Sequence, residues 1–250
     1  MKKIIFFLFF ISSFAEATPY YRFWRGHKKP EISNSLFQSG LNSQVIPKTI
    51  RLGSGNGMIG YLPAIPSSNG PKGTPEEVAL IIYKSKAHYK KYLSSEEGKK
   101  LGEVQNNYYR KGLSNSKAPQ RFLGKVKIGK AYELLQSSHN WSQGHSVLTT
   151  RVKRRNSETS EYLKSIEALL SGSRNYKKRG LQQMIILVSD ELTYAYTLWD
   201  SKKSYNRLKK TQGYVNLIAK IQSDLALVDE VSLNKNKGHI SPGQGLNLKF

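Results

Sequence analysis

The 250-residue chain contains no cysteine, so no disulfide bond stabilises it and no thiol can act as a nucleophile. Aspartate first occurs at Asp190, which excludes an aspartate pair repeated in both halves of the chain. The G-x-S-x-G motif of serine hydrolases is missing. Helix-turn-helix and zinc-finger patterns are missing too, so the sequence does not indicate recognition of a specific DNA site. These absences remove several common classes of enzyme and regulator.

Acidic residues and long apolar runs are also scarce. The chain has 40 Lys and Arg against 17 Asp and Glu, a net charge of +23. The apolar run at residues 4–14 follows two lysines and precedes an A-x-A site, which is typical of a signal peptide. We therefore expect residues 1–17 to be removed and the protein to be exported to the periplasm or the medium; an uncleaved anchor is the alternative. Removing two lysines and one glutamate leaves +22.

Apolar periodicity predicts the element order β-α-β-β-α-β twice. In the first half it predicts strands at 18–26, 58–65, 77–85 and 122–135, and helices at 33–46 (ending before Pro47) and 86–109. In the second half it predicts strands at 145–154, 181–189, 192–201 and 225–233, and helices at 157–170 and 202–222. Residues 53–57, GSGNG, follow a helix and therefore form a turn, not a dinucleotide-binding loop.

A short motif supports an internal duplication. YKSKAHY (83–89) and WDSKKSY (199–205) both follow a predicted strand, and each has an aromatic residue, Ser-Lys and Tyr at the same offsets. In both copies the serine is expected to cap the following helix. The predicted organisation is a signal peptide at 1–17, a ferredoxin-like repeat at 18–138, a linker at 139–145, a second repeat at 146–233 and a flexible basic tail at 234–250.

Tandem βαββαβ units resemble the dimeric α+β barrel superfamily, which includes antibiotic-biosynthesis-monooxygenase-like and haem-degrading proteins. The resemblance implies an α+β fold in which two sheets face each other, helices lie outside and a ligand pocket lies between the sheets. A single chain would then supply both halves of the barrel, as a pseudo-dimer, and the protein is expected to be a monomer. Haem-degrading members use an Asn, a Trp and a helical His, but Trp24, Trp199 and His88 do not match that set residue by residue. No cofactor is therefore predicted, and Trp199 and Tyr83 are expected to be wall residues.

Strand alternation suggests an anion site between the sheets. Arg22 shares one face of its strand with Tyr20 and Trp24. If Phe23 and Val152 face the helices, Arg22 and Arg151 enter the inter-sheet space, where Tyr196 is a further candidate. Two guanidinium groups in one cavity favour a carboxylate or phosphate. The alternative is that each arginine pairs with a carboxylate such as Glu133, Asp229 or Glu230.

Basic residues cluster along the sequence and predict an anionic partner. A polyanion such as nucleic acid, lipopolysaccharide or acidic glycan would relieve the repulsion between them, while a general contribution to solubility is the competing interpretation. His139 and His145 have neither cysteine nor acidic neighbours, so no metal site is predicted. The basic surface is expected to comprise Lys86, Lys90, Lys91, Arg154, Arg155, Lys177, Lys178, Arg179, Lys203, Arg207 and Lys210.

The sequence thus predicts an exported, non-enzymatic binding protein for a polyanion, an outer-membrane lipid surface or a small anion. One alternative is a monooxygenase-like or haem-binding enzyme with Arg22, Arg151, Trp24 and Tyr196 in a site between the sheets. Another is a structural or interaction protein. An enclosed cavity between the sheets would favour the enzyme, and a filled barrel would remove that site.

Overall fold

The computed structural model describes residues 18–250 except 68–72, 136–139, 142 and 235–237. The predicted signal peptide, His139 and part of the predicted linker lie outside the described residues. Every helix in the described part of the chain is too short or too polar to span a bilayer.

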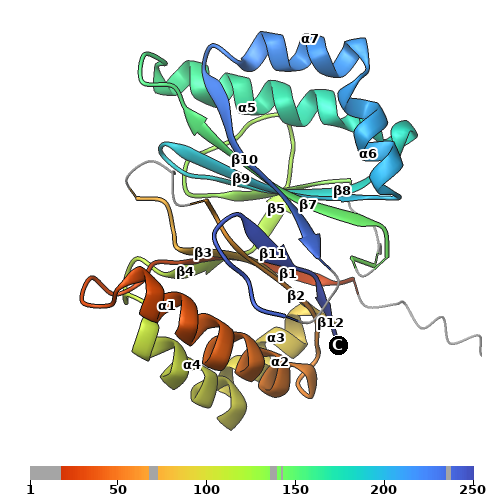
Figure 1. Cartoon of the computed structure of the whole chain (residues 1–250). Helices are drawn as coiled ribbons and strands as arrows, with labels where there is room; N and C mark the ends of the chain where they lie inside the picture. Colours follow the sequence, from red (N-terminus) through yellow and green to blue (C-terminus); the bar gives the residue numbers. More distant parts are fainter. Residues whose placement is uncertain (1–17, 68–72, 136–139, 142, 235–237) are drawn as a thin grey trace, which may run out of the picture.

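The first half is an antiparallel sheet with helices on one face (Figure 1), and its strands lie in the order β4-β1-β3-β2. The strands are β1 (Tyr20–Gly26), β2 (Met58–Ile65), β3 (Glu77–Tyr83) and the short β4 (Asn115–Lys117). The helical segments are α1 (Asn34–Gly40), η1 (Leu41–Val45), α2 (Ile46–Ser54), α3 (Lys86–Ser94) and α4 (Glu96–Tyr108).

The second half repeats this arrangement with strand order β10-β7-β9-β8-β6-β5. The strands are β5 (Pro119–Arg121), β6 (Ala131–Leu134), β7 (His145–Lys153), β8 (Leu181–Val188), β9 (Leu192–Trp199) and β10 (Leu225–Asn234). The helical segments are α5 (Thr159–Ser173), η2 (Arg174–Arg179), α6 (Lys202–Lys209) and α7 (Gln212–Ile221).

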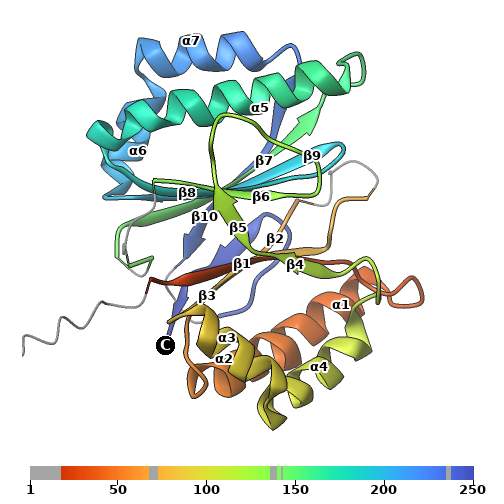
Figure 2. The ribbon, with the colours of Figure 1, turned by 180° about the vertical axis from the view of Figure 1, so that it is seen from behind.

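The two sheets join into a nearly closed barrel. Strand β11 (Gln244–Leu246) pairs with β10 on one side and β2 on the other. At the opposite end of the strand order, β4 and β5 belong to different halves but are separated in the chain by Ala118 alone. Seen from both sides, the helices cover the outer faces of the two sheets (Figures 1 and 2). The predicted fold class, an intramolecular α+β barrel of tandem ferredoxin-like units, is confirmed.

Side chains from both sheets fill the space between them. Phe23 of β1 and Tyr196 of β9 are fully buried there, with ring centroids 5.3 Å apart. The Tyr196 hydroxyl donates across the barrel to the carbonyl of Leu62 at 2.8 Å. The apolar core between the sheets therefore holds the two halves together, and of the predicted ligand-site residues Tyr196 lies within it.

The fourth strand of the first repeat differs from the prediction. Within 122–135 only 131–134 is a strand, and it pairs with β8 of the second half. The preceding loop turns at Gly124 and Gly129, whose φ values of 102° and 77° favour glycine. The three-residue β4 takes the place beside β1 instead.

The prediction that Pro47 ends the first helical region is wrong. Pro47 lies in the first turn of α2, where its missing N–H is not needed, so the helix continues to Ser54. The two long predicted helices are each divided, at Ser95 between α3 and α4 and at Thr211 between α6 and α7. Both residues cap the helix that follows them. Ser95 and Thr211 are 116 positions apart, as are Ser85 and Ser201, so the repeat extends beyond the short motif.

The motif itself acts as predicted. The Ser85 hydroxyl caps α3, and the Ser201 hydroxyl caps α6. Tyr89 packs against Tyr83 with ring centroids 5.1 Å apart, and Tyr205 packs against Trp199 at 5.2 Å.

Within the predicted flexible tail, residues 244–246 and 248–249 form strands instead. After β11, strand β12 (Leu248–Lys249) also pairs with β2. Leu246 and Leu248 are 4% and 5% exposed, and Ile240 is also buried. Backbone pairing and apolar burial fix this segment, although its sequence lacks an obvious period.

Candidate functional site

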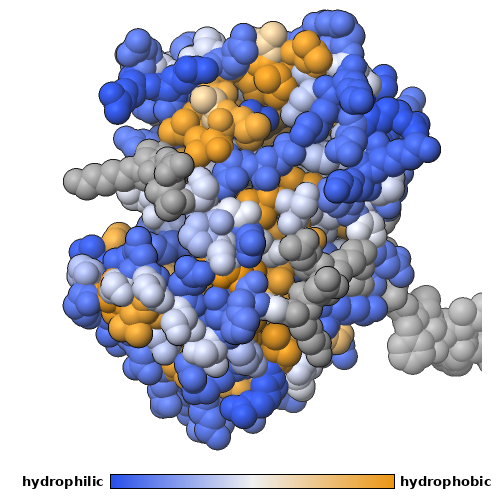
Figure 3. All heavy atoms as spheres, viewed as in Figure 1, coloured by the Kyte–Doolittle hydropathy of each residue, from blue (hydrophilic) through white to orange (hydrophobic). Residues whose placement is uncertain are grey.

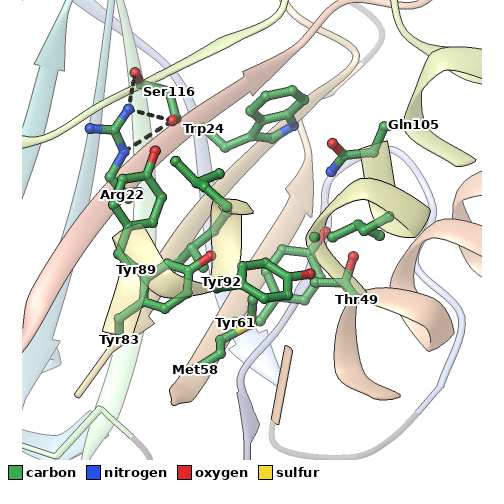
Figure 4. Close-up of a pocket in the computed structure, with 14 residues that line it drawn as sticks. Arg22, Trp24, Thr49, Met58, Tyr61, Tyr83, Tyr89, Tyr92, Gln105 and Ser116 are labelled. Carbon is green, nitrogen blue, oxygen red and sulfur yellow. Dashed lines mark hydrogen bonds between the residues drawn. The ribbon is translucent and has the colours of Figure 1, made fainter. Parts of the chain in front are cut away.

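A cavity of about 120 Å³ lies between the first sheet and helices α2, α3 and α4 (Figure 4). It therefore lies on the helix side of the sheet, outside the barrel core. Its wall is unusually aromatic for its size, because β1, β2, β3 and α3 each contribute at least one ring. The aromatic lining residues are Trp24, Tyr61, Tyr83, Tyr89 and Tyr92.

Two buried hydroxyl groups in this wall have no hydrogen-bond partner. They are those of Tyr92 on α3 and Thr49 on α2, whose residues are 3% and 2% exposed. The Thr49 hydroxyl lies near that of Tyr61, yet no hydrogen bond of ordinary geometry joins them. Burial raises the pKa of Tyr92 to about 12, so its hydroxyl is protonated at neutral pH and can donate. An unpaired buried hydroxyl is costly and suits a cavity that receives a polar ligand.

Arg22 supplies a positive charge at one side of the cavity. Its Nε donates to Ser116 Oγ at 3.0 Å and its Nη2 donates to the Ser116 carbonyl at 2.7 Å. Its guanidinium carbon lies 4.9 Å from the centre of the Tyr89 ring. Among the described residues, no carboxylate lies within ion-pair distance of this arginine. Arg22, a predicted anion-binding residue, thus lies at this cavity and not between the sheets.

A buried carboxylate lies behind the cavity wall. Glu77 is fully buried and accepts hydrogen bonds from Tyr61 at 2.6 Å, Tyr109 at 2.5 Å and Trp24 Nε1 at 2.9 Å. Burial raises the pKa of Glu77, and these three donors oppose that rise. Gly26 allows the Tyr109 ring to lie directly against the backbone of β1, since a Cβ at this position would overlap that ring. The hydrogen bonds to Glu77 therefore hold Trp24 and Tyr61 in place in the cavity wall.

In the corresponding region of the second half, the described side chains pack together. Trp199, Tyr205 and Leu208 occupy it in one buried cluster. Arg151 corresponds to Arg22 and also lies toward the helices, near Tyr205, but it is only 6% exposed. The duplication has therefore kept an arginine and a tyrosine at the same places in both halves, and the first half has a cavity beside them.

The predicted inter-sheet site is corrected in most of its members. Tyr20, Arg22 and Trp24 lie on the helix side of β1 because Phe23 and Tyr21 occupy the barrel core. Arg151 lies on the helix side for the same reason, since Val152 packs against that core. Only Tyr196 lies between the sheets, where its hydroxyl is used by the backbone.

Arg25 is the arginine of β1 that points between the sheets. Its Nη1 donates to Ser189 Oγ at 3.0 Å and its Nη2 to Asn115 Oδ1 at 3.2 Å. Tyr194 lies near it in the barrel core. These contacts join the two halves at one end of the barrel.

The predicted basic residues are all exposed but do not form one patch. Those of η2 and α6 lie together, because these two segments contact each other, and hydrophilic side chains cover the surface over α6 (Figure 3). Those of α3 belong to the other half, and Arg154 and Arg155 follow β7. Lys209, the last residue of α6, forms an ion pair with Glu230 at 2.8 Å and so adds no free charge to this surface.

Sequence reasoning missed Glu77, Thr49 and Tyr92 as site residues. Glu77 could have been recognised from its position at the start of an otherwise apolar strand, since a glutamate there is buried when the strand is central and then needs hydrogen-bond partners. Thr49 had no signal, because the predicted helix ended before it. Tyr92 had no signal in the sequence, because only its unpaired hydroxyl separates it from an ordinary core residue.

Several solved structures resemble this chain in shape. A presumed monooxygenase from Fusobacterium nucleatum is 13% identical with a TM-score of 0.46, and the match covers 94% of this chain and 99% of that one. A presumed monooxygenase from Lactobacillus acidophilus is 10% identical with a TM-score of 0.43, covering 93% and 100%. A haem-binding protein from Thermus thermophilus is 8% identical with a TM-score of 0.37, covering 87% and 92%.

A further neighbour, from Listeria monocytogenes, is a ferredoxin-fold protein related to antibiotic biosynthesis monooxygenases; it is 12% identical with a TM-score of 0.29, and the match covers 68% of this chain and 94% of that one. No protein-family model matches the chain, and no curated protein sequence matches it. Identities and TM-scores this low carry no conclusion about activity. The function is therefore inferred from the cavity.

A haem group does not fit this cavity. Its volume of about 120 Å³ is well below the ~300–1,000 Å³ typical of sites for drug-sized ligands. No histidine lines it, and His88 is exposed on α3 with its Nδ1 2.8 Å from Ser85 Oγ. Within the described residues, no group of three or more His, Asp or Glu side chains is placed to hold a metal ion.

Proposed function

We propose that the protein binds a small aromatic anion in the cavity between the first sheet and helices α2 to α4. This corresponds to the small-ligand alternatives of the sequence analysis, with the site moved from the inter-sheet space to the helix side. The observation that carries it is the half-buried Arg22, which has no carboxylate partner among the described residues and lies at an aromatic cavity containing two unpaired hydroxyls.

The size and lining of the cavity define the ligand class. An engineered cavity of about 150 Å³ accommodates benzene, so the ~120 Å³ here limits the enclosed part of a ligand to one aromatic ring at most. Aromatic walls favour a flat ring through offset and edge contacts. The guanidinium of Arg22 favours a carboxylate on that ring. A benzoate-like compound satisfies all three features.

Ligand binding tests the proposal directly. We expect benzoate derivatives to bind wild-type protein in isothermal titration calorimetry, and Arg22→Gln to weaken binding at least tenfold through loss of a charged hydrogen bond. Arg155→Gln is the matched control, because it removes the same charge from an exposed site in the turn after β7, remote in sequence from Arg22. Equal affinities of the two variants would refute the role of Arg22. Oxygen uptake in the presence of a bound ligand would extend the proposal to a monooxygenase-like reaction.

A second candidate function uses the basic surface formed by η2 and α6. Lys177, Lys178, Arg179, Lys203 and Arg207 are exposed there on two segments in contact. We propose that this surface holds a polyanion, since neutralising several cations together releases counterions. Lys203→Glu with Arg207→Glu should elute earlier from heparin than Lys90→Glu with Lys91→Glu, which carries the same charge. Identical elution would show that net charge alone governs retention.

Export and the monomeric state complete the proposal. Residues 1–17 have the pattern of a signal peptide, so the N-terminus of the mature protein should be Thr18 when the full chain is expressed in a bacterium. The intramolecular barrel already joins two sheets, which supports a monomer in solution. N-terminal sequencing and light scattering test the two expectations.

A further inference from the structure

Glu77 gives the cavity a fixed hydrogen-bond polarity. Its carboxyl group is fully buried, and no cation lies within ion-pair distance of it among the described residues. Its hydrogen-bonding partners are three donor groups: the hydroxyls of Tyr61 and Tyr109 and the indole N–H of Trp24. Above its raised pKa, Glu77 is ionised and its carboxylate can only accept, so each of these groups then directs its hydrogen toward Glu77.

This arrangement leaves Tyr61 as an acceptor toward the cavity. The single hydroxyl hydrogen of Tyr61 is used by Glu77 Oε1 at 2.6 Å, so only lone pairs of its oxygen remain. Tyr61 lines the cavity, and its hydroxyl lies near that of Thr49, which lines it as well. Trp24 also lines the cavity, but its N–H is engaged by Glu77.

The opposite side of the cavity has the opposite polarity. Arg22 can only donate, and Figure 4 shows it with Ser116 on one side, while Thr49 lies on the other. The unpaired hydroxyls of Tyr92 and Thr49 can donate or accept, so they impose no direction of their own. The cavity therefore runs from a donor at Arg22 to an acceptor at Tyr61.

We infer that the ligand is an aromatic acid that carries a hydrogen-bond donor, such as a hydroxyl group, on the part of the ring away from its carboxylate. The inference rests on the proposed function and specifies the ligand class further. Glu77 acts in it as a positioning residue, because it holds the Tyr61 hydroxyl in the accepting orientation. A ligand without the donor leaves Tyr61 unpaired in a buried site, which is the stronger basis of discrimination.

Wild-type protein and a ligand series test the inference without any mutation. The probes are 4-hydroxybenzoate and 3-hydroxybenzoate, each compared with the fluorobenzoate substituted at the same position, which is close in size but cannot donate. We expect at least one hydroxybenzoate to bind about tenfold or more tightly than its fluoro counterpart. If both kinds bind equally, the inference is overturned while the proposed function stands. If no benzoate binds, the proposed function itself fails.

Two variants then locate the acceptor. Tyr61→Phe should abolish the preference for the hydroxyl group while retaining affinity for the fluorobenzoate. Tyr109→Phe is the matched control, because it also removes one hydrogen bond to Glu77 but does not line the cavity, and it should keep the preference. Circular dichroism establishes that each variant is folded. A hydroxyl preference that survives in Tyr61→Phe would show that another group accepts, and would overturn the assignment.

Discussion

Replacing Tyr92 with phenylalanine removes one oxygen atom from the cavity wall and leaves the ring in place. In the folded protein this hydroxyl is buried and has no partner, whereas in the unfolded chain it bonds to water. Folding therefore loses a hydrogen bond at this position. Leaving a buried polar group unpaired costs about 1–3 kcal/mol.

We consequently expect Tyr92→Phe to raise the free energy of unfolding by about 1 kcal/mol or more. For a chain of this length, 1 kcal/mol corresponds to a rise in melting temperature of about 2–4 °C. The same variant should bind the aromatic acid more weakly, because the hydroxyl is available to the ligand. Increased stability together with reduced affinity is the signature of a group retained for binding.

Urea denaturation and calorimetric titration measure the two effects, and two other tyrosines provide controls. The Tyr194 hydroxyl is also buried and unpaired, but it lies in the barrel core, so Tyr194→Phe should increase stability without changing affinity. Tyr61→Phe should reduce stability by about 1.5–3 kcal/mol, because it loses a hydrogen bond to a carboxylate. A loss of stability in Tyr92→Phe would refute the reasoning, since it would mean that the hydroxyl is bonded in the folded protein.

Two further predictions concern the buried carboxylate and the tail. Because burial raises the pKa of Glu77 above its ordinary value of 4.5, the folded state binds this proton more tightly; its contribution to stability should be largest below pH 4.5 and fall as pH rises through the raised pKa. This fall should be missing from the curve of unfolding free energy against pH of Glu77→Gln, measured by urea denaturation, and a variant curve with the same fall as the wild type would exclude Glu77 as its source. Deleting residues 244–250 should lower the unfolding free energy by several kcal/mol, since burial of Leu246 and of Leu248 each stabilises the fold by about 1.5–3 kcal/mol. An unchanged denaturation midpoint would show that the tail is dispensable.

The sequence predicted the repeated element order because each element has its own local signal. Ser85 and Ser201 show this most clearly, since a serine before a helix caps it through contacts within three residues. The strands of the central sheets were recognised for the same reason, from their apolar and aromatic composition. The partner of β6 was not recognised, because strand pairing depends on residues far apart in the chain.

Strand alternation determined that Arg22, Tyr20 and Trp24 share one face of β1, and this is correct. It could not determine which face meets the helices, because both faces of the strand carry large aromatic side chains. Only the tertiary structure decided this, by packing Phe23 against Tyr196 of the other sheet and leaving Arg22 beside the helices. The same packing placed the cavity beside Arg22 on the outer side of the first sheet, since a cavity is what remains when side chains from distant elements do not meet.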